Sequence, residues 1–169
     1  MHLDSALGKN YHFIRIDSCL GILTMADRKK IKQRIIDALR MKGFKVTTQR
    51  MEIIDILAIE VDHPSAQFLL NKVRQRMPRV SASTVYYTLG LLKREGLIKE
   101  LEFYNMENRY ESRMTDHIDL ICEKCGTIEN YERDLSGIPA KIENETGFKA
   151  HKLRYEYYGT CRKCGQKKV

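Results

Sequence analysis

The chain has 169 residues, a formal net charge of +8 at pH 7, 43% hydrophobic residues and three prolines. This composition argues against an intrinsically disordered protein, and the length allows one ordinary domain or two small ones. The excess of Lys and Arg suits a polyanionic partner, most commonly nucleic acid, although a basic protein without such a partner has the same charge.

Residues 1–24 show no clear hydrophobic period and are expected to form a loose N-terminal extension, or to result from a translation start placed too far upstream. They do not resemble a signal peptide, because Arg15 and Asp17 interrupt their only apolar stretch. No apolar run in the chain reaches membrane-spanning length. We therefore expect a cytoplasmic protein with no membrane partner.

Four helices are predicted between residues 25 and 96. The first carries Ile31, Ile35 and Leu39 at helical spacing, and Gly43 stands where it would end. Capping residues and helix breakers bound the other three. Thr48 opens the second and His63-Pro64 breaks it, Ser65 opens the third and Met77-Pro78 ends it, and residues 81–83 open the fourth, which Gly96 closes.

A hairpin is predicted directly after the fourth helix. Residues 97–103 and Arg109–Ser112 have strand-forming composition, and residues 105–108 between them are turn-like. Helices followed by a recognition helix and a hairpin make a helix-turn-helix unit with a wing. The sequence therefore predicts a winged-helix DNA-binding domain over residues 25–108.

Residues 109–169 are predicted to form a small α/β dimerisation and metal-binding domain, so the fold class is α+β. Strands are expected over residues 118–122, 127–133 and 148–158, and a helix capped by Ser136 is expected to end at Gly147. A domain of this size has a limited hydrophobic core, so a bound structural metal would add stability that the core alone does not supply.

Four of the five cysteines form two Cys-x-x-Cys pairs, Cys122/Cys125 and Cys161/Cys164. Four thiolates suit tetrahedral zinc, and two intervening residues let a tight knuckle aim both sulfurs at one ion. An odd cysteine count with paired spacing indicates metal binding in a reducing compartment rather than a disulfide framework. We predict a structural Zn²⁺ site.

Two other classes of protein share parts of this pattern. A thiol–disulfide enzyme uses a Cys-x-x-Cys pair, but its motif normally opens a helix, whereas a strand is expected after Cys125. We therefore predict that the protein is not an enzyme. An iron–sulfur centre, or a zinc-stapled adaptor that never touches DNA, is a further alternative.

The start of the fourth helix is rich in hydroxyl groups. Hydroxyls can bond phosphates, and a tyrosine ring can pack on a thymine methyl group. An ordinary solvated basic helix has the same spacing. The candidate contacts to double-stranded DNA are Arg50, Ser83, Thr84, Tyr86 and Tyr87.

His63, Glu111, His117 and Asp119 are candidates for a regulatory metal site. On a strand, residues 117 and 119 point to the same face, so both side chains can bind one ion. A mixture of imidazole and carboxylate suits Fe(II), Mn(II) or Zn(II) better than Cu(I). Any one of these residues alone is more often an ordinary surface residue.

Several segments together resemble the ferric uptake regulator family over residues 30–167. One matches the family's recognition helix and two contain its zinc cysteines. The segments are Thr47-Thr48-Gln49-Arg50, His63-Pro64-Ser65-Ala66, Ser83-Thr84-Val85-Tyr86-Tyr87-Thr88-Leu89, Cys122-Glu123-Lys124-Cys125-Gly126, and Tyr158-Gly159-Thr160-Cys161 with Cys164.

The resemblance implies a homodimeric, metal-dependent transcriptional repressor that binds a palindromic operator and controls metal homeostasis or oxidative-stress genes. It places His63, Glu111 and His117 on positions that bind regulatory Fe(II) or Mn(II) between the two domains. Asp119 falls where the family usually has histidine, and Asn130 where it usually has Asp or Glu.

Peroxide sensing is the alternative within this family. Members of that kind let bound iron oxidise a nearby histidine, and the resemblance associates them with Asp at the position of Glu111. Glu111 and Asn130 both depart from that pattern, so metal sensing is the favoured interpretation.

Overall fold

The computed structural model describes residues 24–60, 63–103, 107–151 and 153–166. The predicted N-terminal extension therefore lies outside the described residues except for Thr24. The elements, in chain order, are α1 (Met25–Met41), α2 (Thr48–Ile59), α3 (Ala66–Arg76), α4 (Ala82–Arg94), β1 (Lys99–Leu101), β2 (Arg109–Glu111), β3 (Ile118–Cys122), β4 (Ile128–Tyr131), α5 (Gly137–Thr146), β5 (Glu156–Gly159) and α6 (Arg162–Gly165).

Each of the first four helices begins at a hydroxyl side chain that accepts a hydrogen bond from a backbone amide of the first turn. Thr24, Ser65 and Ser81 occupy this position for α1, α3 and α4. For α2 the predicted cap was wrong by one residue. The hydroxyl of Thr47 accepts from the Arg50 amide at 3.2 Å, and Thr48 is already the first helical residue. Such caps satisfy amides that have no partner inside the helix.

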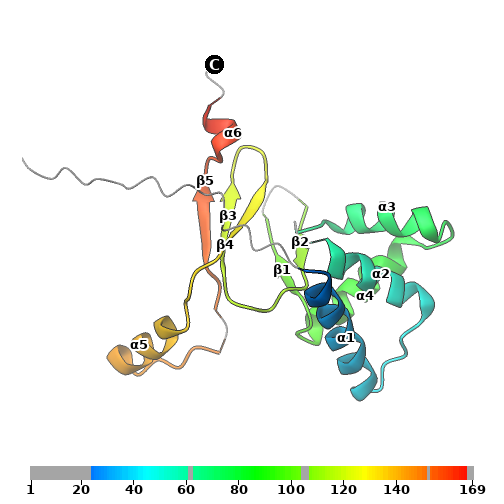
Figure 1. Cartoon of the computed structure of the whole chain (residues 1–169), viewed down its shortest axis with the longest axis horizontal. Coiled ribbons are helices and arrows are strands. Elements are labelled where there is room, and N and C mark those ends of the chain that lie inside the picture. Colours follow the sequence, from blue (N-terminus) through cyan, green and yellow to red (C-terminus); the bar gives the residue numbers. More distant parts are fainter. Residues whose placement is uncertain (1–23, 61–62, 104–106, 152, 167–169) are drawn as a thin grey trace, which may run out of the picture.

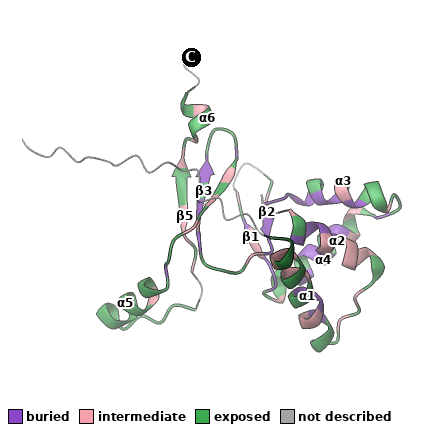
Figure 2. Cartoon of the chain, in the orientation of Figure 1, coloured by how far each residue is buried: buried purple, intermediate pink, exposed green. Residues whose placement is uncertain are grey.

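Helices α1 to α4 pack around one hydrophobic core, which is the main buried region in Figure 2. Strands β1 and β2 form an antiparallel hairpin directly after α4, with Glu100 opposite Tyr110. The Tyr110 side chain packs against the helical core and is 7% exposed. Its burial holds the hairpin against the helices, as expected of a wing. The best-buried core residues are Ile35, Leu39, Ile53, Ile54, Leu57, Leu69, Val73, Val85 and Leu92.

The second half contains a three-stranded sheet in the order β4-β3-β5 (Figure 1). Strand β3 pairs antiparallel with β4 and parallel with β5. Helix α5 stands apart from this sheet and has no buried residue. The predicted α+β class is confirmed, and none of the helices in the described ranges has the length and apolarity to span a membrane.

Two local predictions in this half were wrong. The strand expected over residues 148–158 is confined to Glu156–Gly159. Within the described part of the chain, β5 pairs with β3 alone, and that pairing starts at the carbonyl of Tyr155. The Ser136 hydroxyl does not cap α5, because it donates to Asp134 Oδ1 at 2.7 Å. Gly147 ends α5 with a φ of 72°, as expected.

Candidate metal centres and DNA-binding surface

Four titratable side chains gather between the two halves of the molecule. His63 lies in the loop between α2 and α3, Glu111 ends β2, His117 immediately precedes β3, and Asp119 lies within β3. Each offers one ligand atom, and these atoms all lie within 4.8 Å of one another. We call this group the hinge cluster. It combines residues of the α2–α3 loop and the β1–β2 hairpin with residues at the start of and within β3.

Short distances connect the members of the hinge cluster. His117 Nε2 lies 3.1 Å from a Glu111 oxygen and 3.2 Å from an Asp119 oxygen, and His63 Nε2 lies 3.3 Å from the same Asp119 oxygen. No member is more than 8% exposed. The facing ring nitrogens and carboxylate oxygens nevertheless lack partners in hydrogen-bond geometry.

Buried polar atoms without partners are costly, so their convergence calls for a shared ligand. A divalent cation between two imidazoles and two carboxylates would satisfy them together. This set of nitrogen and oxygen donors fits Fe(II), Mn(II) or Zn(II). Metal ions of this kind are Lewis acids that bind these donors by coordination and neutralise the carboxylate charge.

His63 is held in a backbone conformation that only the surrounding structure explains. Its φ of 50° lies in the left-handed region, which costs a non-glycine residue about 1 to 3 kcal/mol. The next residue, Pro64, accepts a hydrogen bond from the Tyr110 amide at 3.0 Å, and Ser65 forms a bridge to Arg109. The loop is thereby fastened to β2, which brings His63 beside Glu111.

The orientation of His117 is fixed by its other ring nitrogen. His117 Nδ1 lies 2.8 Å from the Thr115 carbonyl oxygen, so Nε2 faces the carboxylates. Burial by itself lowers the pKa of this imidazole, but the nearby carboxylates of Asp119 and Glu111, which stabilise the protonated ring, outweigh it and raise the pKa to about 10. In the absence of metal the two carboxylates therefore favour the protonated ring, and metal binding at Nε2 requires loss of that proton.

Asn130 is a residue of this region that the ligand prediction did not include. It is the direct partner of Asp119 in the β3–β4 pairing, and directly paired residues on neighbouring strands lie on the same face. Its side-chain oxygen Oδ1 is buried and has no hydrogen-bond partner. The signal in the sequence for a role of Asn130 near the metal site was its position, where the family usually has a carboxylate.

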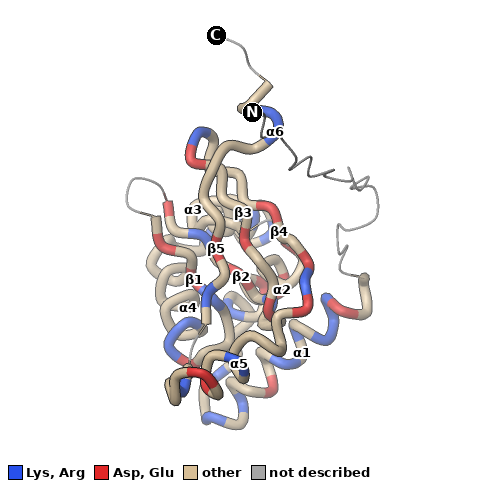
Figure 3. Tube along the Cα trace, turned by 90° about the vertical axis from the view of Figure 1, so that its left-hand side faces the viewer, with Lys and Arg blue, Asp and Glu red and all other residues tan. Residues whose placement is uncertain are grey.

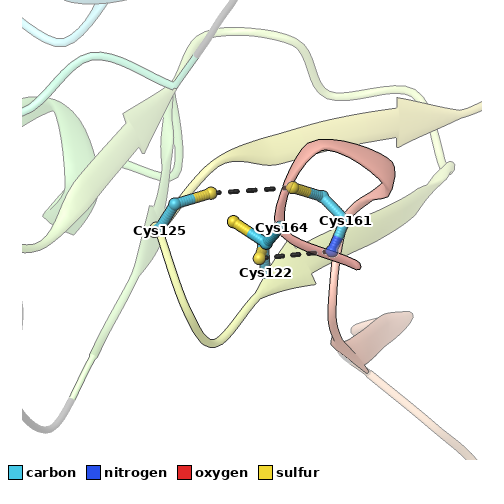
Figure 4. Close-up of side chains that lie close together, drawn as sticks. All are labelled: Cys122, Cys125, Cys161 and Cys164. Atoms are coloured by element: carbon cyan, nitrogen blue, oxygen red, sulfur yellow. Dashed lines mark hydrogen bonds between the residues drawn. The ribbon is translucent and has the colours of Figure 1, made fainter. Parts of the chain in front are cut away.

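The four predicted zinc cysteines also come together (Figure 4). Cys122 ends β3, Cys125 follows in the turn to β4, Cys161 precedes α6 and Cys164 lies within it. Their sulfur atoms lie within 4.8 Å of one another, and Cys125 Sγ is 3.7 Å from Cys161 Sγ. A tetrahedral site with zinc–sulfur bonds of about 2.3 Å has sulfur–sulfur edges of about 3.8 Å. The geometry therefore fits zinc.

Backbone geometry supports thiolate chemistry in this cysteine cluster. Gly126 takes a φ of 69° in the turn after Cys125. The Cys161 amide donates to Cys122 Sγ at 3.2 Å and lowers the pKa of the Cys122 thiol to about 6. The second pair does open a short helix, as a redox motif would, but sulfurs of both pairs meet in one cluster. That gathering favours a metal site over a dithiol enzyme.

The predicted DNA contacts lie on one surface around α4. Tyr86 and Tyr87 are 53% and 63% exposed, and the Arg50 guanidinium lies 5.9 Å from the centre of the Tyr87 ring. The hydroxyls of Ser83 and Thr84 each lie 2.8 Å from that of Ser81 at the start of the helix. Lys and Arg recur along α1 and at the end of α4 (Figure 3). Beside the exposed tyrosines, Arg50 supplies a positive charge to this surface.

A winged helix joined through a buried imidazole and carboxylate cluster to a cysteine-stapled sheet defines a metal-dependent, DNA-binding transcription regulator. The model of the ferric uptake regulator family matches residues 41–158. The chain belongs to this family, as the sequence motifs indicated.

Individual relatives agree with this assignment. The peroxide operon regulator of Bacillus subtilis is 32% identical over 133 residues, which are 78% of this chain and 92% of the relative. The solved structure of a Campylobacter jejuni peroxide stress regulator has a TM-score of 0.62 at 26% identity, covering 80% of this chain and 97% of the other. The Helicobacter pylori ferric uptake regulator shares the fold, with a TM-score of 0.71 at 24% identity, covering 84% and 96%.

Proposed function

We propose that this protein is a cytoplasmic repressor that binds a palindromic operator as a homodimer when the hinge cluster holds Fe(II) or Mn(II). The observation that carries the proposal is the origin of the ligands. His63 lies in the α2–α3 loop and Glu111 in β2, which pairs with β1, whereas His117 precedes β3 and Asp119 lies within it, in the three-stranded sheet. One ion held by all four residues would fix the orientation of the two halves.

The mechanism is a population shift between arrangements of the two halves. A metal ion that all four ligands can reach only in one arrangement binds that arrangement more tightly and increases its population. In a dimer, the same arrangement sets the distance between the two α4 helices. Repression follows when that distance matches the spacing of two operator half-sites.

Exposed apolar side chains in the C-terminal part of the chain support dimerisation through that part. We propose residues 25–108 as the DNA-binding domain and residues 109–169 as the dimerisation domain. By these bounds β2 opens the second domain, but it pairs with β1 of the first and so connects the two. In the single chain, apolar side chains of the second domain are exposed, as expected of a surface that a second copy covers. They are Met114, Leu120, Tyr131, Ile138, Ile142, Phe148, Tyr157 and Tyr158.

A binding experiment tests the proposal directly. Duplexes recovered by in vitro selection with Mn(II)-loaded, full-length protein should be palindromic. Fluorescence anisotropy on those duplexes should show tighter binding with Mn(II) than after chelation by about 5- to 150-fold, the usual range of coupling between two ligands. Equal affinity with and without metal would contradict the proposal.

Two substitutions should separate base reading from phosphate contact. Tyr86→Ala is expected to weaken binding to the selected operator much more than binding to random duplex, because Tyr86 is exposed on α4, the helix that we propose reads the bases. Arg50→Ala should weaken both and flatten the salt dependence, as expected for a phosphate contact. Equal losses of Tyr86→Ala on both duplexes would remove Tyr86 from base reading.

Peroxide sensing is the second candidate, because the Bacillus subtilis relative is a peroxide operon regulator. The test is to load the protein with Fe(II), add dilute peroxide and search His63 and His117 by mass spectrometry for one added oxygen. With Glu111 in the cluster we expect no rapid gain of oxygen and no loss of DNA binding. Rapid oxidation accompanied by loss of DNA binding would make peroxide the signal.

A further inference from the structure

A chain of hydrogen bonds in the segment between β2 and β3 ends on a hinge-cluster histidine. Arg113 Nη1 and Nη2 donate to the two carboxylate oxygens of Glu132 at 2.6 and 2.7 Å. Arg113 Nε donates to the Thr115 hydroxyl at 2.8 Å. The carbonyl of Thr115 lies 2.8 Å from His117 Nδ1. One guanidinium thus connects the end of β4 to the residue that orients His117.

The start of the same segment is fastened to the winged-helix side. Arg34 of α1 donates to the Ser112 carbonyl oxygen at 2.8 Å. The Ser112 hydroxyl, which is buried, donates to the carbonyl oxygen of Leu57 in α2 at 3.1 Å. Residues 112 and 117 are therefore both fixed, and Arg113 ties the segment between them to the sheet. A substitution of Arg113 is therefore expected to change the position of the segment that connects the winged-helix side to the three-stranded sheet.

We propose that Arg113, held by Glu132, is a positioning residue for the regulatory metal. Its fork-shaped guanidinium fixes Thr115, and the Thr115 carbonyl holds the His117 ring with Nε2 facing Glu111 and Asp119. The inference rests on the proposed metal-binding role of the hinge cluster. Partners that orient a metal-ligating histidine typically change metal affinity by about 10- to 100-fold.

The sign of the effect distinguishes positioning from simple electrostatics. A guanidinium close to a cation site repels the cation, so removal of its charge alone should tighten metal binding. Loss of a positioning contact should weaken it. Lysine keeps the charge but lacks the planar fork that bonds Glu132 and Thr115 together, so Arg113→Lys is also expected to weaken binding.

The test is a Mn(II) titration of full-length, zinc-containing protein. Arg113→Ala and Arg113→Lys should each raise the Kd for Mn(II) by about tenfold or more. Arg76→Ala is the matched control, because it removes another arginine that contacts a glutamate, Glu52, at 2.7 Å but lies far along the chain in α3. In metal-free protein, the imidazole ¹⁵N signals of His117 should shift in the Arg113 variants and stay unchanged in Arg76→Ala.

The outcomes separate this inference from the proposed function. Unchanged or tighter Mn(II) binding by both Arg113 variants, with unshifted His117 signals, would overturn the positioning role. If His117→Ala binds Mn(II) as tightly as the unaltered protein, the hinge cluster itself is wrong. Should Arg113→Ala fail to fold, Thr115→Val provides the test, because it removes the hydroxyl that accepts from Arg113 Nε without changing any charge, and its Kd should rise as well.

Discussion

Cys122→Ser is expected to remove zinc and to unfold the C-terminal part of the molecule. Among the described residues after Glu111, the buried hydrophobic side chains are Ile121, Cys122 and Leu135, which is a very small core. The cysteine cluster fastens the β3–β4 turn to α6 at the other end of this part. Structural zinc contributes about 10 to 16 kcal/mol in zinc-finger peptides, so its loss outweighs what this core supplies.

Three measurements check this expectation. Zinc content, melting temperature and molecular mass in solution should all fall for Cys122→Ser, because the unfolded domain cannot form the dimer. Cys19→Ser is the matched control, since it replaces the one cysteine outside the two pairs. A Cys122→Ser protein that keeps the melting temperature and dimer mass without zinc would show that the staple is not needed.

The features of the fold that the sequence predicted correctly depend on residues close together in the chain. Ser65 and Ser81 open helices because a hydroxyl can satisfy the first free amides, and Gly147 ends one because it accepts a positive φ. The prediction of a long strand over residues 148–158 was wrong, because the length of a strand depends on the neighbouring strand with which it pairs. Strand β5 extends only as far as β3 offers hydrogen bonds, and the local alternation of residues carries no information about that partner.

The candidate sites divide in the same way. The zinc cysteines were predictable from their Cys-x-x-Cys spacing. His117 and Asp119 were predictable as a pair because alternate residues of a strand lie on the same face. His63 was a candidate by residue type, and the family motif supported it, but local spacing does not connect it to the other ligands because the fold brings it across from another loop. Arg113 and Glu132 had no sequence signal, since a long-range ion pair follows from how the chain returns after β4.

The second large effect concerns His63, whose removal should uncouple metal binding from DNA binding. His63→Ala leaves Glu111, His117 and Asp119, which can still hold Mn(II) with reduced affinity. The α2–α3 loop then no longer contributes a ligand. At saturating Mn(II), the variant should bind the selected operator no more tightly than metal-free protein, a loss that equals the full metal-dependent gain of about 5- to 150-fold.

His117→Ala is the comparison variant for His63→Ala, because it removes a ligand beside β3 instead of one in the α2–α3 loop. It removes a ligand on the sheet side whose ring lies 3.1 and 3.2 Å from both carboxylates, so it should mainly weaken metal binding. His151→Ala, at an exposed position, should change neither property. If His63→Ala saturated with Mn(II) bound the operator as the unaltered protein does, then Glu111 alone would transmit the signal from the winged-helix side. The metal would then act through the β1–β2 hairpin, and the α2–α3 loop would have no part in the switch.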